Sequence, residues 1–367
     1  MKNITCVVGT RPNFIKISQF QLEFEKQFPG KFNFSLVHTG QHFDDEMSNI
    51  FFKQFNLPQP HQLNIQAKNP AQQIGETIAQ LAQHFNTHKP DAVIVVGDVN
   101  STLAGALAAH KNGYFLYHLE AGLRSFDRSM PEEINREITD KVSDRFFVTE
   151  SSGIDHLLEE QTDNAHIYFV GNTMIDTLIA FEPMIEKSSV LEQYNLTPHE
   201  YALITFHRPS NVDSYKKLHE LTEIIETITR HQKTLFPIHP RTKNNLLKHH
   251  LWEKITALEN LIITSPLSYF DFQKSIKYAK YIVTDSGGIQ EETTFRKIPC
   301  LTFRQNTERP VTITMGTNTL IPNQMALEEN IEKIYLNQYK KGEIPPLWDG
   351  KATQRIVKHI YNDLYEK

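Results

Sequence analysis

The chain alternates short runs of apolar residues with longer stretches in which apolar residues recur every three or four positions. The short runs have the length of β-strands, and many end in a turn of glycine or small polar residues. In the first half they lie at residues 4–8, 34–37, 92–96, 115–119, 146–148 and 167–170. In the second half they lie at residues 202–206, 235–238, 261–263, 281–284 and 300–303. Between them, stretches such as 218–228 and 272–279 have helical periodicity, so the pattern predicts alternating strands and helices.

Strands this apolar are typical of parallel sheets, which are covered by helices on both faces. Alternation of such strands with helices predicts an α/β fold with doubly wound sheets. The strands form two sets, separated by a more polar stretch around residues 186–200, and 367 residues exceed what one hydrophobic core usually serves. We therefore expect two Rossmann-like domains that face each other across a cleft, with ligands bound beyond the carboxyl ends of the strands.

Composition and charge narrow the class of protein. The net charge is −5 with a pI near 6.4, which argues against a protein that coats nucleic acid. The apolar runs are too short to span a bilayer, and the N-terminus reaches Gly9 too soon to contain a secretory signal. Two cysteines, Cys6 and Cys300, exclude a disulfide framework and a cysteine zinc cluster. We expect a soluble, cytoplasmic protein with no nucleic-acid or membrane partner.

A candidate diphosphate site follows the strand predicted at residues 281–284. Gly287 and Gly288 remove side chains where a ligand could approach the backbone, and Ser286 could cap the helix that follows. A helix N-terminus favours a phosphate, and Glu292, about one turn further on, could accept hydrogen bonds from ribose hydroxyls. The alternative is an ordinary capped helix with acidic residues in its first turns.

The first turn of the chain offers two cations. Arg11 precedes Pro12 at a predicted helix start, and Lys16 lies roughly one helical turn further on. Together they could neutralise a diphosphate, although a solvated pair of side chains is an equal alternative. No glycine-rich dinucleotide fingerprint and no P-loop motif occurs, which disfavours dehydrogenases and P-loop enzymes.

Acidic residues gather after two other predicted strands and at a helix start. Asp98 and Glu120 each follow a strand, and Glu132 follows Pro131, with Arg136 four residues later. Three carboxylates that converge on one pocket could provide a general base and a general acid, because crowding raises the pKa of one of them. The alternative is a capped surface helix with a structural Glu132–Arg136 salt bridge.

One histidine stands out from the 17 in the chain. His207 ends the first strand of the second half, where it could shuttle a proton, bind substrate or satisfy a buried polar group. No histidine pair with a companion acid indicates a metal site, so we expect no metal.

These motifs together resemble the non-hydrolysing UDP-N-acetylglucosamine 2-epimerases, and they run in order from residue 9 to residue 310. They are Gly9-Thr10-Arg11-Pro12 with Lys16, Thr39-Gly40-Gln41-His42, Gly97-Asp98, Glu120-Ala121-Gly122-Leu123-Arg124, Pro131-Glu132-Glu133 with Asn135-Arg136, Gly171-Asn172-Thr173, His207-Arg208, Pro266-Leu267 with Tyr269 and Phe272, Asp285-Ser286-Gly287-Gly288 with Gln290-Glu291-Glu292, and Thr307-Glu308-Arg309-Pro310.

The resemblance implies a GT-B fold whose C-terminal helix, residues 352–365, returns to the first domain. The domains expected are residues 1–170 with 352–367, and residues 171–351. It also implies interconversion of UDP-N-acetylglucosamine and UDP-N-acetylmannosamine: loss of the C2 proton with anti elimination of UDP, formation of 2-acetamidoglucal, and re-addition. No cofactor is implied, because no hydride moves. The implied partners are a UDP-sugar and a second copy of the chain in a homodimer.

The resemblance assigns roles by motif position. The catalytic positions are Asp98, Glu120, Glu132 and His207, while Arg11 and Lys16 match the phosphate and sugar side, with Arg136 in the same constellation. The diphosphate loop is matched by Ser286, Gly287 and Gly288. Glu292 matches the ribose contact, Phe272 matches the uracil neighbour, and Arg309 matches a sugar contact. We expect Asp98 and Glu120 to act at C2 with help from Glu132, while the choice of base and acid stays open.

The chain departs from the common pattern in two places. Asn13 replaces a glutamate, and Pro209-Ser210 replace an Arg-Glu pair. Some relatives bind an activating UDP-sugar through residues that match Gln41 and His42 and through further arginines. The departures leave open other UDP-2-acetamido sugars, including diacetamido uronic acids. Rival functions are a hydrolysing epimerase, a GT-B glycosyltransferase and a non-catalytic nucleotide-sugar sensor.

Overall fold

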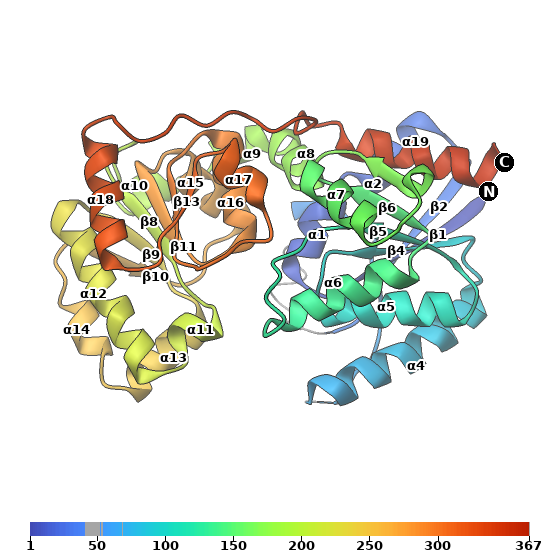
Figure 1. Ribbon diagram of the computed structural model, residues 1–367, viewed down its shortest axis with the longest axis horizontal. Helices are drawn as coiled ribbons and strands as arrows, with labels where there is room; N and C mark the ends of the chain where they lie inside the picture. The colour runs from blue at the N-terminus through green and yellow to red at the C-terminus, as the bar shows by residue number, and fades with distance from the viewer. Residues whose placement is uncertain (41–51, 53, 68, 367) are drawn as a thin grey trace. The chain divides into compact units, whose positions relative to one another are not determined.

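The structure, a computed structural model, describes residues 1–40, 52, 54–67 and 69–366 and divides the chain into two compact units. Unit 1 comprises Met1–Ile179 and Pro346–Lys367, and unit 2 comprises Ala180–Pro345. Each unit contains its own parallel sheet with helices on both faces (Figure 1). The alternation of strands and helices predicted from the hydrophobic pattern is thereby confirmed.

The sheet of unit 1 has the order β3-β2-β1-β4-β5-β6-β7, with every neighbouring pair parallel. Its strands are β1 (Lys2–Val8), β2 (Phe32–His38), β3 (His61–Gln62), β4 (Ala92–Val96), β5 (Phe115–Leu119), β6 (Arg145–Val148) and β7 (Ile167–Phe169). Its helices are α1 (Arg11–Ile17), α2 (Phe20–Gln27), α4 (Pro70–His88), α5 (Asn100–Lys111), α6 (Pro131–Val142), α7 (Ser151–Glu159), η1 (Asn164–His166), α8 (Thr173–Ala180, which ends at the unit boundary) and α19 (Ala352–Tyr365).

The central strands of this sheet are covered on both sides. All five residues of β4 are buried, as expected for a strand that is apolar at every position. Helices α4, α5 and α6 lie on one side of the sheet, and α2, α7 and α19 lie on the other (Figure 1). This packing leaves the carboxyl ends of the strands, and the turns that follow them, as the edge where functional side chains gather.

The C-terminal helix α19 packs on α2 within unit 1. The ring of Tyr361 stacks on Phe28 with centroids 4.1 Å apart. At its N-terminus, the carboxylate of Asp176 accepts hydrogen bonds from the backbone N–H groups of Ala352 at 3.1 Å and Thr353 at 2.6 Å. Both ends of α19 are therefore attached to the first Rossmann-like unit.

Near its C-terminal end, α19 is also tied to the sheet by Asp363, whose removal we expect to destabilise unit 1. Its carboxylate accepts hydrogen bonds from the hydroxyls of Tyr117 and Tyr168, both at 3.0 Å, and Arg145 lies 3.4 Å away. Asp363→Ala leaves the fully buried Tyr117 hydroxyl without an acceptor, which we expect to cost about 2–4 kcal/mol of unfolding free energy. Urea denaturation measures this loss.

The control for this prediction is Lys358→Gln on the exposed face of the same helix, which should change the unfolding free energy by less than about 0.5 kcal/mol. Equal unfolding curves for Asp363→Ala and the unchanged protein would show that α19 is held by its apolar face alone.

The sheet of unit 2 has the order β10-β9-β8-β11-β12-β13 and is also entirely parallel. Its strands are β8 (Ala202–Thr205), β9 (Thr234–Pro237), β10 (Leu261–Thr264), β11 (Tyr281–Thr284), β12 (Cys300–Thr302) and β13 (Asn318–Leu320). Its helices are α9 (Glu182–Glu186), α10 (Val190–Gln193), α11 (Pro209–Val212), α12 (Tyr215–His231), α13 (Pro240–Lys248), α14 (Trp252–Thr256), α15 (Tyr269–Lys277), α16 (Gly287–Arg296), α17 (Pro310–Thr314) and α18 (Gln324–Tyr335).

Two apolar clusters cover the two faces of this sheet. One joins the strands to α12, α13 and α18 through residues such as Leu218, Leu246 and Leu327. The other joins them to α10, α15 and α16 through residues such as Leu191 and Ile276. The order of the strands reverses between β8 and β11, so the turns after these two strands form the edge at which ligands bind in folds of this kind.

Two further expectations concern membrane-spanning helices and the two cysteines. In the part of the chain that the structure describes, no helix combines the length and apolar character needed to cross a membrane. Cys6 and Cys300 are both buried and free, and burial raises the pKa of the Cys300 thiol to about 11.

Candidate functional site

In unit 1, a buried ion pair joins α1 to the turn after β5. Lys16 lies on α1, which begins directly after the turn at the end of β1, and its Nζ pairs with Oε2 of Glu120. Both side chains are less than one-tenth exposed. The pair lies against Gly97, where a Cβ atom would come within 3.1 Å of the Glu120 carboxylate and 3.3 Å of the Lys16 Nζ atom. Lys16, Glu120 and the Gly97-Asp98 turn therefore come together.

The turn before α1 is held by Asn13, at one of the positions where the chain departs from the family pattern. Its side-chain oxygen accepts hydrogen bonds from the N–H groups of Gly9 at 3.0 Å and Thr10 at 3.2 Å, and its amide donates to the Val96 carbonyl. The side chain is buried. Asn13 therefore shapes the turn that presents Arg11, the half-buried first residue of α1.

Asp98 is paired with a buried arginine from α6. The Nε and Nη2 atoms of Arg136 both lie 2.9 Å from Oδ2 of Asp98, and Nη1 pairs with the carboxylate of Glu133. The predicted salt bridge between Glu132 and Arg136 is therefore wrong. On α6, positions 133 and 136 face the protein interior, whereas the side chain of Glu132 is half-buried and makes no ion pair within the described residues.

Glu133, which was not singled out as a site residue, organises the loop between β5 and α6. Its fully buried carboxylate accepts hydrogen bonds from the N–H groups of Ser125 at 2.9 Å and Phe126 at 2.8 Å. Burial acts to raise the pKa of Glu133, but these bonds and the pair with Arg136 hold it below its usual range. The ionised carboxylate fixes both the loop and the arginine that binds Asp98.

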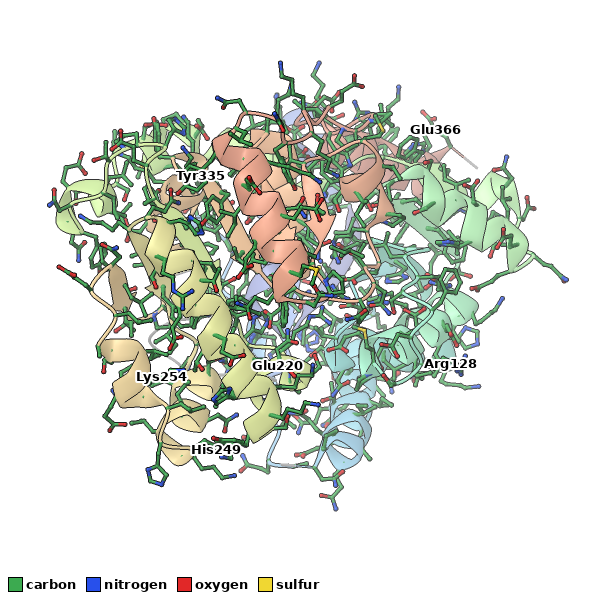
Figure 2. All side chains as sticks on the ribbon, turned by 60° about the vertical axis from the view of Figure 1, so that its left-hand side comes forward. Arg128, Glu220, His249, Lys254, Tyr335 and Glu366 are labelled. Atoms are coloured by element: carbon green, nitrogen blue, oxygen red, sulfur yellow. The ribbon has the colours of Figure 1, made fainter. Side chains whose placement is uncertain are left out.

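Exposure separates this arrangement from an ordinary surface ion pair that joins the preceding loop to the same helix. Arg128, labelled in Figure 2, pairs with Glu137 at 2.6 Å, but its side chain is 69% exposed. Arg136 is 2% exposed. A buried arginine that pairs with two carboxylates is typical of a functional site, whereas an exposed pair such as that of Arg128 contributes little to stability.

Glu120 also has an unusual backbone. Its φ angle is +72°, a left-handed conformation that is uncommon for residues other than glycine. Two residues later, Gly122 has φ of +78°, and a Cβ atom there would lie 2.2 Å from the Gly153 carbonyl oxygen. Strain of this kind concentrates at functional sites, and here it turns the chain sharply after β5.

In unit 2, Asp285 connects the ends of β11 and β8. Its fully buried carboxylate accepts hydrogen bonds from the N–H groups of His207 at 3.1 Å and Arg208 at 2.9 Å. The Nδ1 atom of His207 lies 3.1 Å from Oδ1 of the same carboxylate. Burial acts to raise the pKa of Asp285, but the bonds from His207, Arg208 and Asn211 outweigh it and lower the pKa. Asp285 thus orients His207, whose side chain is 43% exposed and available to a ligand.

Helix α16 begins at Gly287, where the predicted diphosphate loop lies. Ser286 occupies the N-cap position, but its side chain makes no capping hydrogen bond, so the expectation that it caps the helix is wrong. Instead, its N–H group donates to Thr284 Oγ1 at 3.0 Å. Without a side-chain cap, the N–H groups of Gly287, Gly288 and Ile289 in the first turn suit an anion.

Arg309 lies directly against this loop. A Cβ atom on Gly287 would come within 2.7 Å of both Arg309 Nη1 and Glu308 Oε1. Arg309 is buried and pairs with Glu308 and with Glu291, whose Oε2 lies 2.9 Å from Nε of Arg309. Glu308 also lies 2.8 Å from Arg304, so this buried carboxylate holds two arginines beside the N-terminus of α16.

The remaining candidates of unit 2 lie on α15 and α16. Phe272 is half-buried and packs on the cluster that includes Ile276. Glu292 is buried on the inner face of α16, and burial raises its pKa to about 8 against the lowering effects of Gln273 and Arg296. Among the carboxyl groups of the two candidate sites for which shifts are resolved, Glu292 has a raised pKa, whereas the pKa values of Glu133 and Asp285 are lowered.

Sequence reasoning missed the buried partners of the site, namely Glu133, Asp285 and Glu308. The spacing of Glu133 from Arg136 makes it a candidate partner, because residues three apart share a helix face, but Glu132, four residues from Arg136, satisfies the same rule. Asp285 and Glu308 were noted only as parts of motifs, and no local pattern shows that their carboxylates point inward. Gln41 and His42 lie outside the described residues. Among the residues that are described, no group of three or more His, Cys, Asp or Glu side chains is arranged to hold a metal ion.

Comparisons with known proteins identify the family of the chain. Residues 26–361 match the sequence model of a family described as UDP-N-acetylglucosamine 2-epimerase. A Methanocaldococcus jannaschii protein named UDP-N-acetylglucosamine 2-epimerase is 39% identical over 362 residues, which cover 97% of this chain and 98% of that protein. A Pseudomonas aeruginosa protein named UDP-2,3-diacetamido-2,3-dideoxy-D-glucuronate 2-epimerase is 34% identical over 367 residues, covering 98% and 99%.

A solved structure extends the similarity to the fold. The crystal structure of the Methanocaldococcus jannaschii UDP-GlcNAc 2-epimerase in complex with UDP-GlcNAc and UDP superimposes with a TM-score of 0.89. It is 38% identical and covers 98% of this chain and 99% of that one. With two parallel α/β units, this similarity confirms the expected GT-B fold. The chain belongs to the UDP-N-acetylglucosamine 2-epimerase family.

Proposed function

We propose that the protein interconverts UDP-N-acetylglucosamine and UDP-N-acetylmannosamine without hydrolysing them. The observation that carries the proposal is the arrangement in unit 1, where Glu120 and Asp98 follow the adjacent strands β5 and β4 and each is paired with a cation. Epimerisation at C2 requires removal of a proton from one face and its return on the other, for which two positioned carboxyl groups are suited.

Unit 2 would bind the nucleotide. The uncapped N-terminus of α16 would supply the N–H groups from which a diphosphate accepts hydrogen bonds, and Arg309 would contact the sugar. Phe272 would lie beside the uracil ring, and Glu292 would accept hydrogen bonds from the ribose. The crystallised relative with UDP-GlcNAc and UDP supports this assignment of ligand class.

The mechanism follows from the charges that develop. Loss of the C2 proton to a carboxylate and departure of UDP leave 2-acetamidoglucal, and the leaving diphosphate must be stabilised by cations. Arg11 and Lys16 would serve that need, with Arg136 fixing Asp98 in place. His207 would occupy the catalytic position that the family pattern gives it. UDP then adds back while C2 receives a proton on the other face. Asp98 and Glu120 would act at C2, and Glu132 would assist. No electrons are lost or gained overall.

Product analysis tests the proposal against its rivals. Incubation with UDP-N-acetylglucosamine alone should give a stable mixture of the two UDP-sugars. Accumulation of free N-acetylmannosamine and UDP would identify a hydrolysing epimerase instead. Sugar transfer to an added acceptor without a C2 epimer would identify a glycosyltransferase, and UDP binding with no product at all would identify a sensor.

A second candidate substrate is a UDP-2,3-diacetamido uronic acid. It is favoured by the 34% identity to the Pseudomonas aeruginosa protein and by the departures at Asn13 and Pro209-Ser210. The ratio of kcat/KM for the two substrates decides between them. A higher kcat/KM for the diacetamido uronate would show that the protein catalyses the same reaction on that substrate instead.

The raised pKa of Glu292 predicts that UDP binding releases a proton. With a pKa of about 8, this carboxyl group is mostly protonated at pH 7 in the free protein, and it must ionise for both of its oxygen atoms to accept hydrogen bonds from ribose hydroxyls. UDP affinity should therefore fall as pH decreases from 8 to 6, by up to about tenfold per pH unit. Calorimetric titrations in buffers of different ionisation enthalpy measure the release.

The matched variant for this prediction is Glu292→Gln, which retains the shape of the side chain and has no proton to lose. This variant should abolish the proton release that comes from the protein and leave the release that comes from UDP itself. Identical proton release in the variant and the unchanged protein would show that Glu292 keeps its proton when UDP binds.

A further inference from the structure

A buried histidine and aspartate lie between the two turns that carry Asp98 and Glu120. His118 is the fourth residue of β5, and Asp140 lies near the C-terminal end of α6. Nδ1 of His118 is 2.6 Å from Oδ1 of Asp140, and Nε2 of His118 is 2.8 Å from the Gly97 carbonyl oxygen. The side chains are 0% and 1% exposed. Neither residue has a role in the function proposed above.

The hydrogen-bond partners determine the protonation of the ring. Both nitrogens of His118 face oxygen atoms that can only accept, namely an ionised carboxylate and a backbone carbonyl. A neutral imidazole carries one N–H group, whereas an imidazolium carries two. His118 therefore donates from both nitrogens and is positively charged, with Asp140 as its counterion.

Asp140 also holds the turn after Glu120. Its Oδ2 atom accepts a hydrogen bond from the Gly122 N–H group at 3.2 Å and lies 2.7 Å from Nη1 of Arg124. Burial acts to raise the pKa of Asp140, but His118 and Arg124 hold it below its usual range. The Asp140 carboxylate therefore connects both turns. It binds Gly122, two residues after Glu120, directly, and it reaches Gly97, directly before Asp98, through His118.

We propose that Asp140 and His118 are positioning residues. They hold the Gly97-Asp98 turn and the Glu120-Gly122 turn in a fixed relative position for proton transfer at C2. This inference rests on the proposed function. A small misplacement of catalytic groups is costly, since an error of about 1 Å can reduce the rate 100-fold. The strained backbone at Glu120 needs such an anchor, because a residue at φ of +72° persists only when its surroundings hold it there.

The experiment compares Asp140→Asn and His118→Gln with the unchanged protein. Asparagine keeps the shape of Asp140 but removes the charge that stabilises the imidazolium. We expect kcat to fall about 100-fold in each variant, with KM changed less than about threefold. The double variant should be no slower than the slower single variant, because the two residues act as one unit. UDP affinity should stay within about twofold, since UDP is assigned to unit 2.

The pH profile distinguishes positioning from a merely structural role. The charged groups that face Asp140 are His118 from β5 and Arg124, with Glu160 beyond Arg124 and Lys141 beyond Glu160. In Asp140→Asn, His118 loses its counterion. The ratio of variant to unchanged kcat should therefore rise as pH is lowered from about 8 to about 6. A pH-independent ratio would overturn the proposal.

A measurement on the unchanged protein does not depend on how the variants fold. Nitrogen-15 spectra at pH 7 should contain one histidine ring with both nitrogens protonated, and that signal should be missing in His118→Gln. Glu137→Gln, on the exposed face of α6, is the control and should leave kcat and the spectrum unchanged. A neutral His118 ring would overturn the inference and leave the proposed function intact. A kcat of Asp140→Asn within threefold of that of the unchanged protein would do the same. Absence of C2 exchange by the unchanged protein would overturn the proposed function and the inference with it.

Discussion

Replacing Asp98 with Asn or Glu120 with Gln should lower kcat about 10³–10⁴-fold and leave UDP affinity within about twofold. Each change keeps the size of the side chain and removes the carboxylate proposed to exchange a proton with C2. The nucleotide is assigned to unit 2, so its binding should persist. Steady-state kinetics and calorimetric titration with UDP provide the two readouts.

The Glu120 variant has a second expected effect, on stability. Its partner Lys16 is less than one-tenth exposed and would be left as an uncompensated buried charge. We expect a loss of about 3–5 kcal/mol in unfolding free energy, which the Asp98 variant should not share to the same extent because Asp98 is 26% exposed. Kinetics should therefore be measured at a temperature where the Glu120 variant is folded.

Glu159→Gln, an exposed carboxylate of the same unit, provides the control and should leave kcat unchanged. If the Asp98 and Glu120 variants bound UDP poorly but turned over bound substrate normally, these carboxylates would belong to nucleotide binding rather than to chemistry.

Replacing Gly287 with alanine should weaken UDP binding about 100-fold. The new Cβ atom would lie 2.7 Å from Arg309 Nη1 and from Glu308 Oε1, closer than real Cβ contacts. Both partners are buried and ion-paired, so relief of the clash must displace Arg309 or the start of α16. A loss of about 2.8 kcal/mol in binding free energy corresponds to this factor.

Gly75→Ala is a matched control within helix α4, where nothing lies within 4 Å of the new methyl group. It should leave UDP binding unchanged and increase the stability of unit 1 by about 0.5–1 kcal/mol, because alanine favours a helix over glycine. Unchanged UDP affinity in Gly287→Ala would show that the diphosphate is not bound at this loop.

The central strands could be predicted almost to the residue, whereas two of the four edge strands could not. Residues 92–96 and 281–284 are continuous apolar runs, and the structure has strands β4 and β11 over the same residues. The strands β3 and β13 lie at the edges of their sheets and have two and three residues. Their residues are mostly polar and carry no hydrophobic pattern, because an edge strand needs little burial to pair with its neighbour.

The positions of the candidate acids could be predicted, but their partners could not. Asp98 and Glu120 were identified because they follow apolar strands, and the carboxyl ends of adjacent parallel strands share one edge. The partner of Arg136 was misjudged because spacing alone allows both Glu132 and Glu133. Only the buried face of α6 decides between them, and that face is set by packing on the sheet.

Contacts between distant segments are the part that sequence could not provide. His118 and Asp140 are 22 residues apart, and Asp285 is 78 residues from His207. Their pairing depends on strand order and on which way each turn directs its side chain. Neither property has a local signature, so the buried carboxylates that organise both candidate sites appeared only in the folded structure.

Exchange of hydrogen at C2 tests the central claim most directly. Incubation with UDP-N-acetylglucosamine in deuterium oxide, without a nicotinamide cofactor, should place deuterium at C2 of both UDP-sugars and establish an equilibrium that contains the mannosamine epimer. The exchange should be lost in Asp98→Asn. If neither UDP-N-acetylglucosamine nor a UDP-diacetamido uronate acquired deuterium at C2, the protein would not be an epimerase at that carbon.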